Sequence, residues 1–249
     1  MIGIVGYGFV GKAVEYGFSK TDHFIVDPLH FPEHSLADLV EHNPEAIFVC
    51  VPTDDGDQFA TLTDTLDQIA GLGYKGIVVV KSTVLPKYLE GYNVVYNPEF
   101  LSRRTAFEDF VKPHVLVIGG QQSKAKRVLE MYMNYSDVRC DNIFLTSVNA
   151  ASMVKYMFNT YYATKLTFMN QMYDVAQQAG VHWNDIKQIL GKHPWVGTYH
   201  LDVPGYEGRG FSGPCLPKDT KALAAEYDVE LLHKVLELND KYRDENPTS

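Results

Sequence analysis

Six short apolar runs, separated by helix-like stretches, constrain the fold of the first half of this chain. They lie at Ile2 to Val5, Phe24 to Val26, Ala46 to Val51, Ile77 to Val80, Val94 to Tyr96 and Val115 to Ile118. Most are apolar throughout, which is typical of strands buried on both faces of a parallel sheet. Strands that alternate with helices in this way predict an α/β fold with a doubly wound parallel sheet.

A stretch without proline or internal glycine runs from Ser147 to Gly180 and predicts one long helix. Ser147 suits the N-cap, and Gly180 suits the position after the last turn. At about 1.5 Å per residue the helix is about 45 Å long, which is more than one small domain covers. We therefore predict a homodimer through this helix, because its large apolar residues spread over more than one face. These residues are Met153, Tyr156, Met157, Tyr161, Phe168 and Met172.

The remainder of the chain is rich in loops and then helical. Glycines and prolines concentrate between Gly191 and Pro217, and helical patterns follow at Lys218 to Tyr227 and Glu230 to Tyr242. We predict two domains. Residues 1–146 form a dinucleotide-binding domain, and residues 147–249 form a small helical domain.

Composition excludes several classes of protein. The chain has 45% hydrophobic and 21% charged residues, so it can bury a core and is not predominantly disordered. A net charge of −9 without a run of Lys or Arg opposes a nucleic-acid surface. The apolar runs fall far short of the roughly 20 residues of a membrane helix. We expect a soluble protein that binds neither nucleic acid nor membrane.

Cysteines and histidines indicate neither disulfides nor a metal site. Cys50, Cys140 and Cys215 have no short spacing between them, and the nine histidines form no H-E-x-x-H pair. The acidic segment 54–57 is better explained as a polar loop. Met1 leads directly into the first strand, which leaves no room for a secretion signal. A reducing cytoplasm is the expected location.

The motif Gly-Tyr-Gly-Phe-Val-Gly at residues 6–11 stands between the first strand and an apolar helix over Lys12 to Phe18. In this context the first glycine permits a tight turn, the second lets a pyrophosphate approach, and the third lets helix and strand pack closely. The helix N-terminus then faces the anion. The motif predicts a Rossmann-like domain whose cofactor contacts include Gly6, Gly8, Phe9, Val10 and Gly11.

Asp27 follows the second strand, 21 positions after Gly6, where a carboxylate can accept hydrogen bonds from the adenosine ribose. No arginine follows it, and a carboxylate repels a 2′-phosphate. NAD is therefore favoured over NADP. The alternative is a glycine turn in an empty sheet, with Asp27 only starting the Asp-Pro turn.

Four further clusters suggest chemistry: Ser82 to Val84, Asn97 to Leu101, Lys155 with Asn159, and Gly210 to Asp219. The first two follow the fourth and fifth strands, at the edge where such sheets bind ligands. Lys155 and Asn159 lie on one helix face. Singly, a helix lysine is usually solvated, and a cysteine among glycines and prolines is usually inert. Cys215, however, stands near a helix N-terminus beside Lys218, a setting that favours a nucleophilic thiolate.

On these clusters the chain resembles the UDP-glucose/GDP-mannose dehydrogenase family. The resemblance extends from the glycine motif through 51–53, 82–84, 97–101 and 155–159 to the motif at 213–219. It implies oxidation of the C6 hydroxymethyl of a nucleotide sugar to a carboxylate. The reaction uses two NAD and a covalent thioester, and it serves polysaccharide biosynthesis.

The resemblance also implies roles for single residues. Cys215 would be the nucleophile, Lys155 and Asn159 would stabilise oxyanions, and Glu99 would be the base for thioester hydrolysis. Thr83 and Asp219 would hold a water that relays protons. Cofactor contacts would further include Thr53, Thr83 and Lys218. Substrate contacts would come from Glu99, Phe100, Leu101, Lys155, Asn159, Arg209, Gly210 and Gly213.

Some positions depart from the family pattern. Family members usually continue into a further nucleotide-binding domain after the equivalent of Asn239, whereas this sequence ends at Ser249. The arginine that reaches a neighbouring subunit falls at Trp195. Arg209 would compensate for it unless its side chain is solvated.

Two acids of the family pattern are replaced by Arg103 and Ser152. Beside the thioester mechanism, two alternatives stay open. One is a two-electron alcohol dehydrogenase acting on a smaller sugar, for which Cys215 is dispensable. The other is a non-catalytic NAD-binding assembly module. Two NADH per substrate, rather than one, would distinguish the thioester mechanism from the simpler dehydrogenase.

Overall fold

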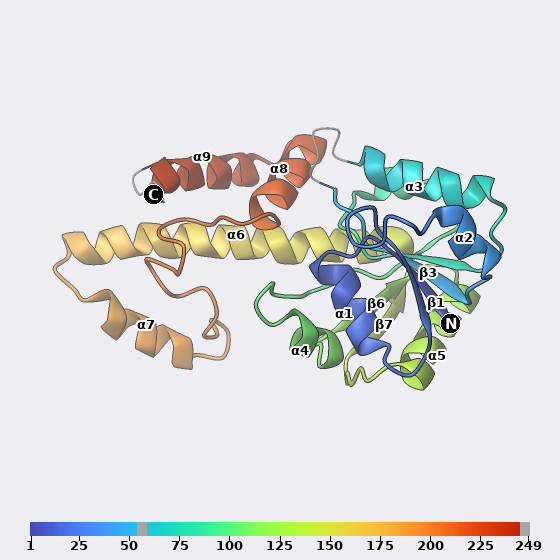
Figure 1. Cartoon of the computed structure of the whole chain (residues 1–249). Coiled ribbons are helices and arrows are strands. Elements are labelled where there is room, and N and C mark those ends of the chain that lie inside the picture. The colour runs from blue at the N-terminus through green and yellow to red at the C-terminus, as the bar shows by residue number, and fades with distance from the viewer. Residues whose placement is uncertain (54–58, 245–249) are drawn as a thin grey trace. The chain divides into compact units, whose positions relative to one another are not determined.

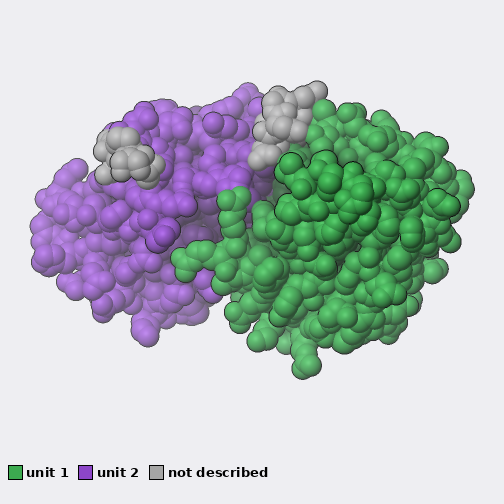
Figure 2. Space-filling view, viewed as in Figure 1, with its two compact units in different colours: residues 1–155 green, residues 156–249 purple. Residues whose placement is uncertain are grey.

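The computed structural model describes residues 1–53 and 59–244, so the predicted polar loop at 54–57 lies outside the described residues. The chain divides into two compact units, Met1–Lys155 and Tyr156–Ser249, which Figure 2 colours separately. We describe each unit by itself. The predicted domain boundary at residues 146 and 147 does not coincide with this division, and it stays a prediction.

The first unit contains a seven-stranded sheet in the order β2-β1-β3-β4-β5-β6-β7 within the described residues. β1 pairs in parallel with β2 on one side and with β3 on the other, so that Ile4 lies level with Ile25 and Phe48. The strands are β1 (Ile2–Val5), β2 (His23–Val26), β3 (Ala46–Val49), β4 (Ile77–Val80), β5 (Val95–Tyr96), β6 (Leu116–Gly119) and β7 (Ile143–Thr146).

All six predicted strands are present, and the α/β fold class is confirmed. The sheet differs from the prediction in two respects. β5 and β6 pair in antiparallel fashion through Tyr96 and Gly119, so the sheet is mixed. β7 was not predicted, although its Ile143, Phe144 and Leu145 form an apolar run; in the structure it is an edge strand whose Phe144 and Leu145 are exposed.

Helices cover both faces of this sheet (Figure 1). One group of helices contributes to a buried core that also includes Ile2, Ile4 and Phe18. It comprises α1 (Phe9–Gly17), α4 (Ala106–Val111) and α5 (Gln122–Tyr135). On the opposite face lie α2 (Leu36–Glu41) and α3 (Ala60–Gly71), which contact each other. This is the predicted doubly wound arrangement. A single 3₁₀ turn at Pro86–Leu89 follows β4.

Helix α6 (Val148–Gln178) confirms the predicted long helix. Ser147 Oγ accepts a hydrogen bond from the Ala150 amide at 3.1 Å, as expected for an N-cap. Gly180 adopts a φ of +69°, and the amide of Val181 donates to the carbonyl of Ala176 at 2.9 Å. The left-handed glycine and the hydrogen bond between residues five positions apart together end the helix at the place that the sequence indicated.

The second unit holds three further helices, α7 (Trp183–Lys192), α8 (Leu216–Tyr227) and α9 (Glu230–Asp244). The last two match the prediction. The sequence analysis did not predict α7. A small core surrounds Trp183, whose indole nitrogen donates to the Leu201 carbonyl at 3.0 Å. No helix among the described residues is long and apolar enough to cross a membrane.

Candidate active site

The glycine loop between β1 and α1 has the geometry that the motif predicted. Gly6 has a φ of +87°, and a Cβ there would lie 2.8 Å from the Cys50 carbonyl oxygen. A Cβ on Gly11 would lie 2.1 Å from the Gly6 carbonyl oxygen, so only glycine fits. A Cβ on Gly8 would meet nothing within 4 Å among the described residues. Gly8 is the N-cap of α1, where amide groups of the first turn are available to an anion.

Asp27 fixes the loop after β2. Its Oδ2 accepts a hydrogen bond from the Tyr7 amide at 2.7 Å, and its Oδ1 accepts from the amides of Leu29 and His30 at 3.0 Å each. Burial opposes ionisation, yet these hydrogen bonds hold the pKa of Asp27 below its usual value. The carboxylate therefore stabilises the turn at residues 27–30, as the alternative interpretation expected, and it also connects that turn to the glycine loop through Tyr7.

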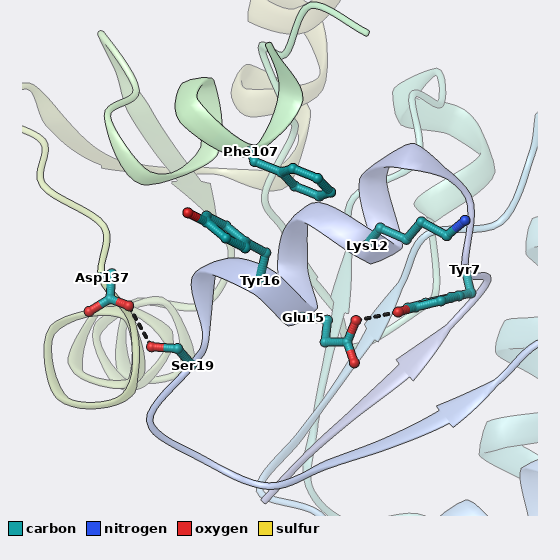
Figure 3. A pocket seen from close by; sticks show the side chains of 7 residues that line it. All are labelled: Tyr7, Lys12, Glu15, Tyr16, Ser19, Phe107 and Asp137. Carbon is teal, nitrogen blue, oxygen red and sulfur yellow. Dashed lines mark hydrogen bonds between the residues drawn. The ribbon is translucent and has the colours of Figure 1, made fainter. Parts of the chain in front are cut away.

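A pocket that the sequence did not indicate lies beside α1 (Figure 3). The Tyr7 hydroxyl donates to Glu15, and Lys12 Nζ lies 5.3 Å from the centre of the Tyr7 ring. Burial and the Glu15 carboxylate raise the pKa of Tyr7 to about 12. The ring centres of Tyr16 and Phe107 lie 4.9 Å apart. None of these side chains was among the predicted site residues.

Glu99 and Lys155 form a buried ion pair in the first unit. Lys155 Nζ lies 3.2 Å from Glu99 Oε1, and the Leu101 amide donates to Glu99 Oε2 at 2.8 Å. Lys155 Nζ also lies 5.5 Å from the centre of the Phe100 ring. The predicted segment after β5 and the lysine of α6 are therefore brought together, and the lysine is not solvated.

Hydroxyl groups anchor the segment after β4. Ser82 Oγ donates to the Val51 carbonyl at 2.6 Å, and Ser152 Oγ donates to the Val84 carbonyl at 2.6 Å. Ser152 is fully buried, so at this departure from the family pattern the serine ties α6 to the segment. Thr53 and Thr83 are both buried. Arg103, the other replaced acid, places its guanidinium 5.7 Å from the centre of the Phe9 ring.

Asp219 is the centre of a polar cluster in the second unit. Its Oδ2 accepts a hydrogen bond from Asn159 Nδ2 at 2.5 Å, and Lys218 Nζ lies 2.7 Å from its Oδ1. Only 1% of Asp219 is exposed. The buried carboxylate therefore orients the Asn159 amide and holds the ammonium of Lys218, which we had expected to contact the cofactor.

Cys215 is the N-cap of α8. Its carbonyl accepts a hydrogen bond from the Asp219 amide at 2.9 Å, which joins the cysteine to the cluster around that carboxylate through the first turn of the helix. Cys215 forms no disulfide with any residue that the structure describes, and the residue is partly exposed. Gly213, just before it, has a φ of +77°, which favours glycine. The backbone thus presents the thiol at a helix N-terminus, as the sequence predicted.

Arg209 is engaged within the second unit, and its side chain is only 14% exposed. Its guanidinium lies 2.7 Å from Asp174 Oδ1 and 4.3 Å from the centre of the Tyr242 ring. At the adjacent Gly210, with a φ of +75°, a Cβ would lie 2.6 Å from Asn239 Oδ1. The side chain therefore connects the loop to α6 and α9 rather than extending into solvent.

Trp195 is 89% exposed, so the structure gives no packing reason for a tryptophan at this position. No group of three or more potential metal ligands occurs within residues 1–53 and 59–244.

One buried side chain beneath the predicted site was missed. Lys81 directly follows the apolar run of β4, and a charge at the end of a buried strand was the signal that could have identified it.

Comparison with known proteins identifies the family. A model of the NAD-binding domain of the UDP-glucose/GDP-mannose dehydrogenase family matches residues 35–136, and a model of its central domain matches residues 149–241. The chain belongs to this family. It carries the family's NAD-binding domain, so NAD is the cofactor, and the geometry of the glycine loop fits a bound dinucleotide pyrophosphate.

Similar proteins include the UDP-glucose 6-dehydrogenase AglM of Haloferax volcanii, which is 26% identical over 96% of this chain and 69% of its own length. The UDP-glucose 6-dehydrogenase of Rickettsia bellii is 31% identical over 73% of this chain, but only 44% of its own length is covered. The solved structure of a UDP-glucose dehydrogenase from Pyrobaculum islandicum matches 96% of this chain and 68% of its own, with a TM-score of 0.80 at 22% identity. The structural match supports the fold.

Proposed function

We propose that this protein oxidises the C6 hydroxymethyl group of a nucleotide sugar that resembles UDP-glucose. The product is a carboxylate, and the reaction passes through a thioester on Cys215. The observation that supports this most directly is the buried pair of Glu99 and Lys155 on the NAD-binding unit. It combines a proton acceptor with an oxyanion-stabilising ammonium. Relatives that match most of this chain are named UDP-glucose 6-dehydrogenase.

In the first oxidation the hydroxymethyl carbon loses a hydride and a proton and becomes an aldehyde. The Cys215 thiol then adds to the aldehyde carbon, and the resulting thiohemiacetal loses a second hydride and proton to become a thioester. Water cleaves the thioester to a carboxylic acid and regenerates the thiol. Bound NAD supplies the hydride acceptor for both oxidations, so two equivalents are consumed.

Each proposed role is assigned to a side chain whose surroundings suit it. Glu99 accepts a proton from the attacking water, and Lys155 stabilises the oxyanion that forms. Asn159 supplies a second donor, and its amide is oriented by Asp219. Thr83 and Asp219 hold the water of the first oxidation.

Substrate contacts are proposed for the segments that carry these residues, namely Phe100, Leu101, Gly210 and Gly213. Arg209 acts there by holding its loop, since its guanidinium is occupied by Asp174 and Asn170. Thr53 and Thr83 are proposed to line the cofactor. A reducing cytoplasm stays part of the proposal and is consistent with three cysteines that form no disulfide in the described chain.

We further propose a homodimer through α6. Four of its large apolar side chains are more than half exposed within the described chain: Met157, Tyr161, Phe168 and Val175. They follow one another at spacings of four, seven and seven residues, which places them along one stripe of a helix. A second copy of the helix would bury this stripe.

The decisive experiment is the yield of NADH with a panel of UDP-sugars, GDP-sugars and free sugars. Two NADH per uronic acid would support the proposal. One NADH per substrate, with full activity in Cys215→Ala, would instead identify a two-electron alcohol dehydrogenase. Binding of NAD without turnover of any sugar would indicate a non-catalytic module.

A further inference from the structure

A lysine ammonium is buried beneath the sheet edge that carries Glu99. Lys81 directly follows β4 and is 3% exposed. Its Nζ donates to both the backbone carbonyl and the side-chain Oδ1 of Asn97, at 2.9 Å each. The Tyr132 hydroxyl donates to the same Oδ1 at 2.6 Å, and Asn97 Nδ2 donates to the Val117 carbonyl at 2.7 Å. Together with the hydrogen bond from the Asn97 amide to the Val80 carbonyl at 2.9 Å, five hydrogen bonds hold Asn97.

Among the described residues, this ammonium has no carboxylate in direct contact. Within residues 1–53 and 59–244 no Asp or Glu lies within ion-pair distance of Lys81, and the Phe110 ring packs 5.5 Å from Nζ. A buried ammonium whose direct hydrogen-bond partners among the described residues are all neutral is costly, and an apolar side chain of similar length would avoid that cost. Such a residue suggests a role in function.

The position of Asn97 indicates what that role is. It follows β5 and precedes Glu99 by two residues, so it fixes the start of the segment that carries the carboxylate. A small cavity is lined by Lys81 together with Pro98, Glu99, Phe100 and Leu101. Lys81 and the segment that carries Glu99 thus border the same cavity.

We propose that Lys81 is a positioning residue for Glu99: by holding Asn97 it keeps the Glu99 carboxylate directed at Lys155. This inference rests on the proposed function. Thioester hydrolysis requires the carboxylate at one place, and a displacement of about 1 Å can cost on the order of a hundredfold in rate. Without the ammonium, the Asn97 side chain keeps the hydrogen bonds from Tyr132 and to Val117, and its backbone amide still donates to the Val80 carbonyl.

The charged state of Lys81 depends on the groups that face it. Burial lowers the pKa of Lys81 to about 8, while Cys50 and Glu99 raise it and Lys155 lowers it. Burial also raises the pKa of Cys50 to about 12 and the pKa of Tyr132 above its usual value, so both are neutral near pH 8.

Asp109 on α4 lines the same cavity. It accepts hydrogen bonds from the Ser102 amide and the Thr105 hydroxyl. The group that changes charge near pH 8 is therefore Lys81. Deprotonation weakens its hold on Asn97, and acid formation is expected to fall above that pH.

The activity test compares Lys81→Met with Tyr132→Phe. Lys81→Met should slow acid formation about tenfold or more while the Kd for NAD stays within about twofold, and the decline above pH 8 should disappear. Tyr132→Phe removes the hydrogen bond to Asn97 and the longer one, 3.5 Å, from Lys81 Nζ, but it keeps the ammonium, so the decline should persist with a loss of about threefold. A Lys81→Met enzyme with the wild-type rate and the wild-type decline would overturn the proposal.

A second measurement does not depend on turnover or on the folding of Lys81→Met. In protein labelled with ¹³C at lysine Cε, one lysine should titrate near pH 8. Glu99→Gln should lower its pKa, because a negative charge that favours the ammonium is removed. An unchanged midpoint in Glu99→Gln, or the absence of a lysine titrating below about pH 10, would refute the coupling. Absence of NADH from every sugar nucleotide would refute the proposed function alone.

Discussion

Lys155 Nζ and Glu99 Oε1 lie 3.2 Å apart, with side chains 5% and 7% exposed. The two residues come from α6 and from the segment after β5, more than 50 positions apart in the chain. A buried pair of this kind contributes little net stability relative to apolar residues, so its presence supports a role in chemistry.

Glu99→Gln should trap an acyl-enzyme. Without its base, thioester hydrolysis slows more than the first hydride transfer does, so the acylated thiol accumulates. Mass spectrometry after mixing with NAD and a sugar nucleotide should show the acyl mass on the peptide holding Cys215. Cys215→Ala is the matched control and should carry no acyl group and form no acid. Full acid production by Cys215→Ala would contradict the covalent mechanism.

Lys155→Met should destabilise the protein by roughly 3 kcal/mol, because it leaves the Glu99 carboxylate buried without its ammonium. The measurement is urea unfolding followed by circular dichroism. The double variant Lys155→Met, Glu99→Gln should recover most of the loss, since no charge is then left unpaired. Equal losses in the single and double variants would mean that the pair does not interact as described.

Asp27→Ala should narrow the preference for NAD over NADP. The carboxylate is held ionised by hydrogen bonds from the Tyr7 and His30 amides, so it accepts from a ribose hydroxyl and repels a 2′-phosphate. Binding of both cofactors can be followed by calorimetry. Unfolding of the variant must be measured alongside, because Asp27 also holds the turn. Equal affinity of the unmodified protein for NAD and NADP would refute the role.

The free energy of unfolding should rise between about pH 8 and pH 9. Lys81 has its pKa lowered to about 8 in the folded protein from an ordinary 10.5. In this window the unfolded chain binds a proton that the folded protein has released, so stability increases with pH. From about pH 9 Cys50, whose pKa burial raises from 9.0 to about 12, opposes the trend, and above pH 10 Tyr7, with its pKa raised to about 12, opposes it further. Lys81→Met should lack the rise, whereas the wild-type slope in Lys81→Met would assign it elsewhere.

Phe168→Glu should dissociate a dimer formed through α6, because it places a charge in the middle of the exposed apolar stripe. Sedimentation should show a dimer for the unmodified protein and a monomer of about half that mass for the variant. Leu231→Glu, which changes an exposed leucine on α9, is the control and should stay dimeric. A stable monomer of the unmodified chain at micromolar concentration would rule out the interface.

The sequence predicted those parts of the fold whose cause is local. The buried runs identified six strands, and Ser147 and Gly180 defined α6 because capping depends on neighbouring backbone groups. β7 and α7 were missed although both carry a local signal, an apolar run at the start of β7 and Trp183, Ile186 and Leu190 at helical spacing in α7. The antiparallel pairing of β5 with β6 depends on tertiary packing that a strand of two residues does not encode.

The same distinction applies to the site. The meeting of Glu99 with Lys155 and of Asn159 with Asp219 was reachable through the family resemblance, which already grouped these residues. The role of Arg209 in holding its loop could not be predicted in this way, because its partners Asp174 and Tyr242 come from two different helices. Lys81 was missed for the opposite reason: its strand was predicted, but no pattern in the sequence shows that its ammonium lies under Asn97.

The three glycines of the nucleotide loop are required for different reasons. Side chains at Gly6 and Gly11 collide with backbone atoms, so in a mutational scan these positions should be intolerant whether the readout is folding or binding. Gly8 has an ordinary extended backbone with a φ of −73° and open space around it. Alanine there is compatible with the fold, and only the cofactor would exclude it. Gly8 is therefore the position at which a library can separate loss of ligand from loss of structure.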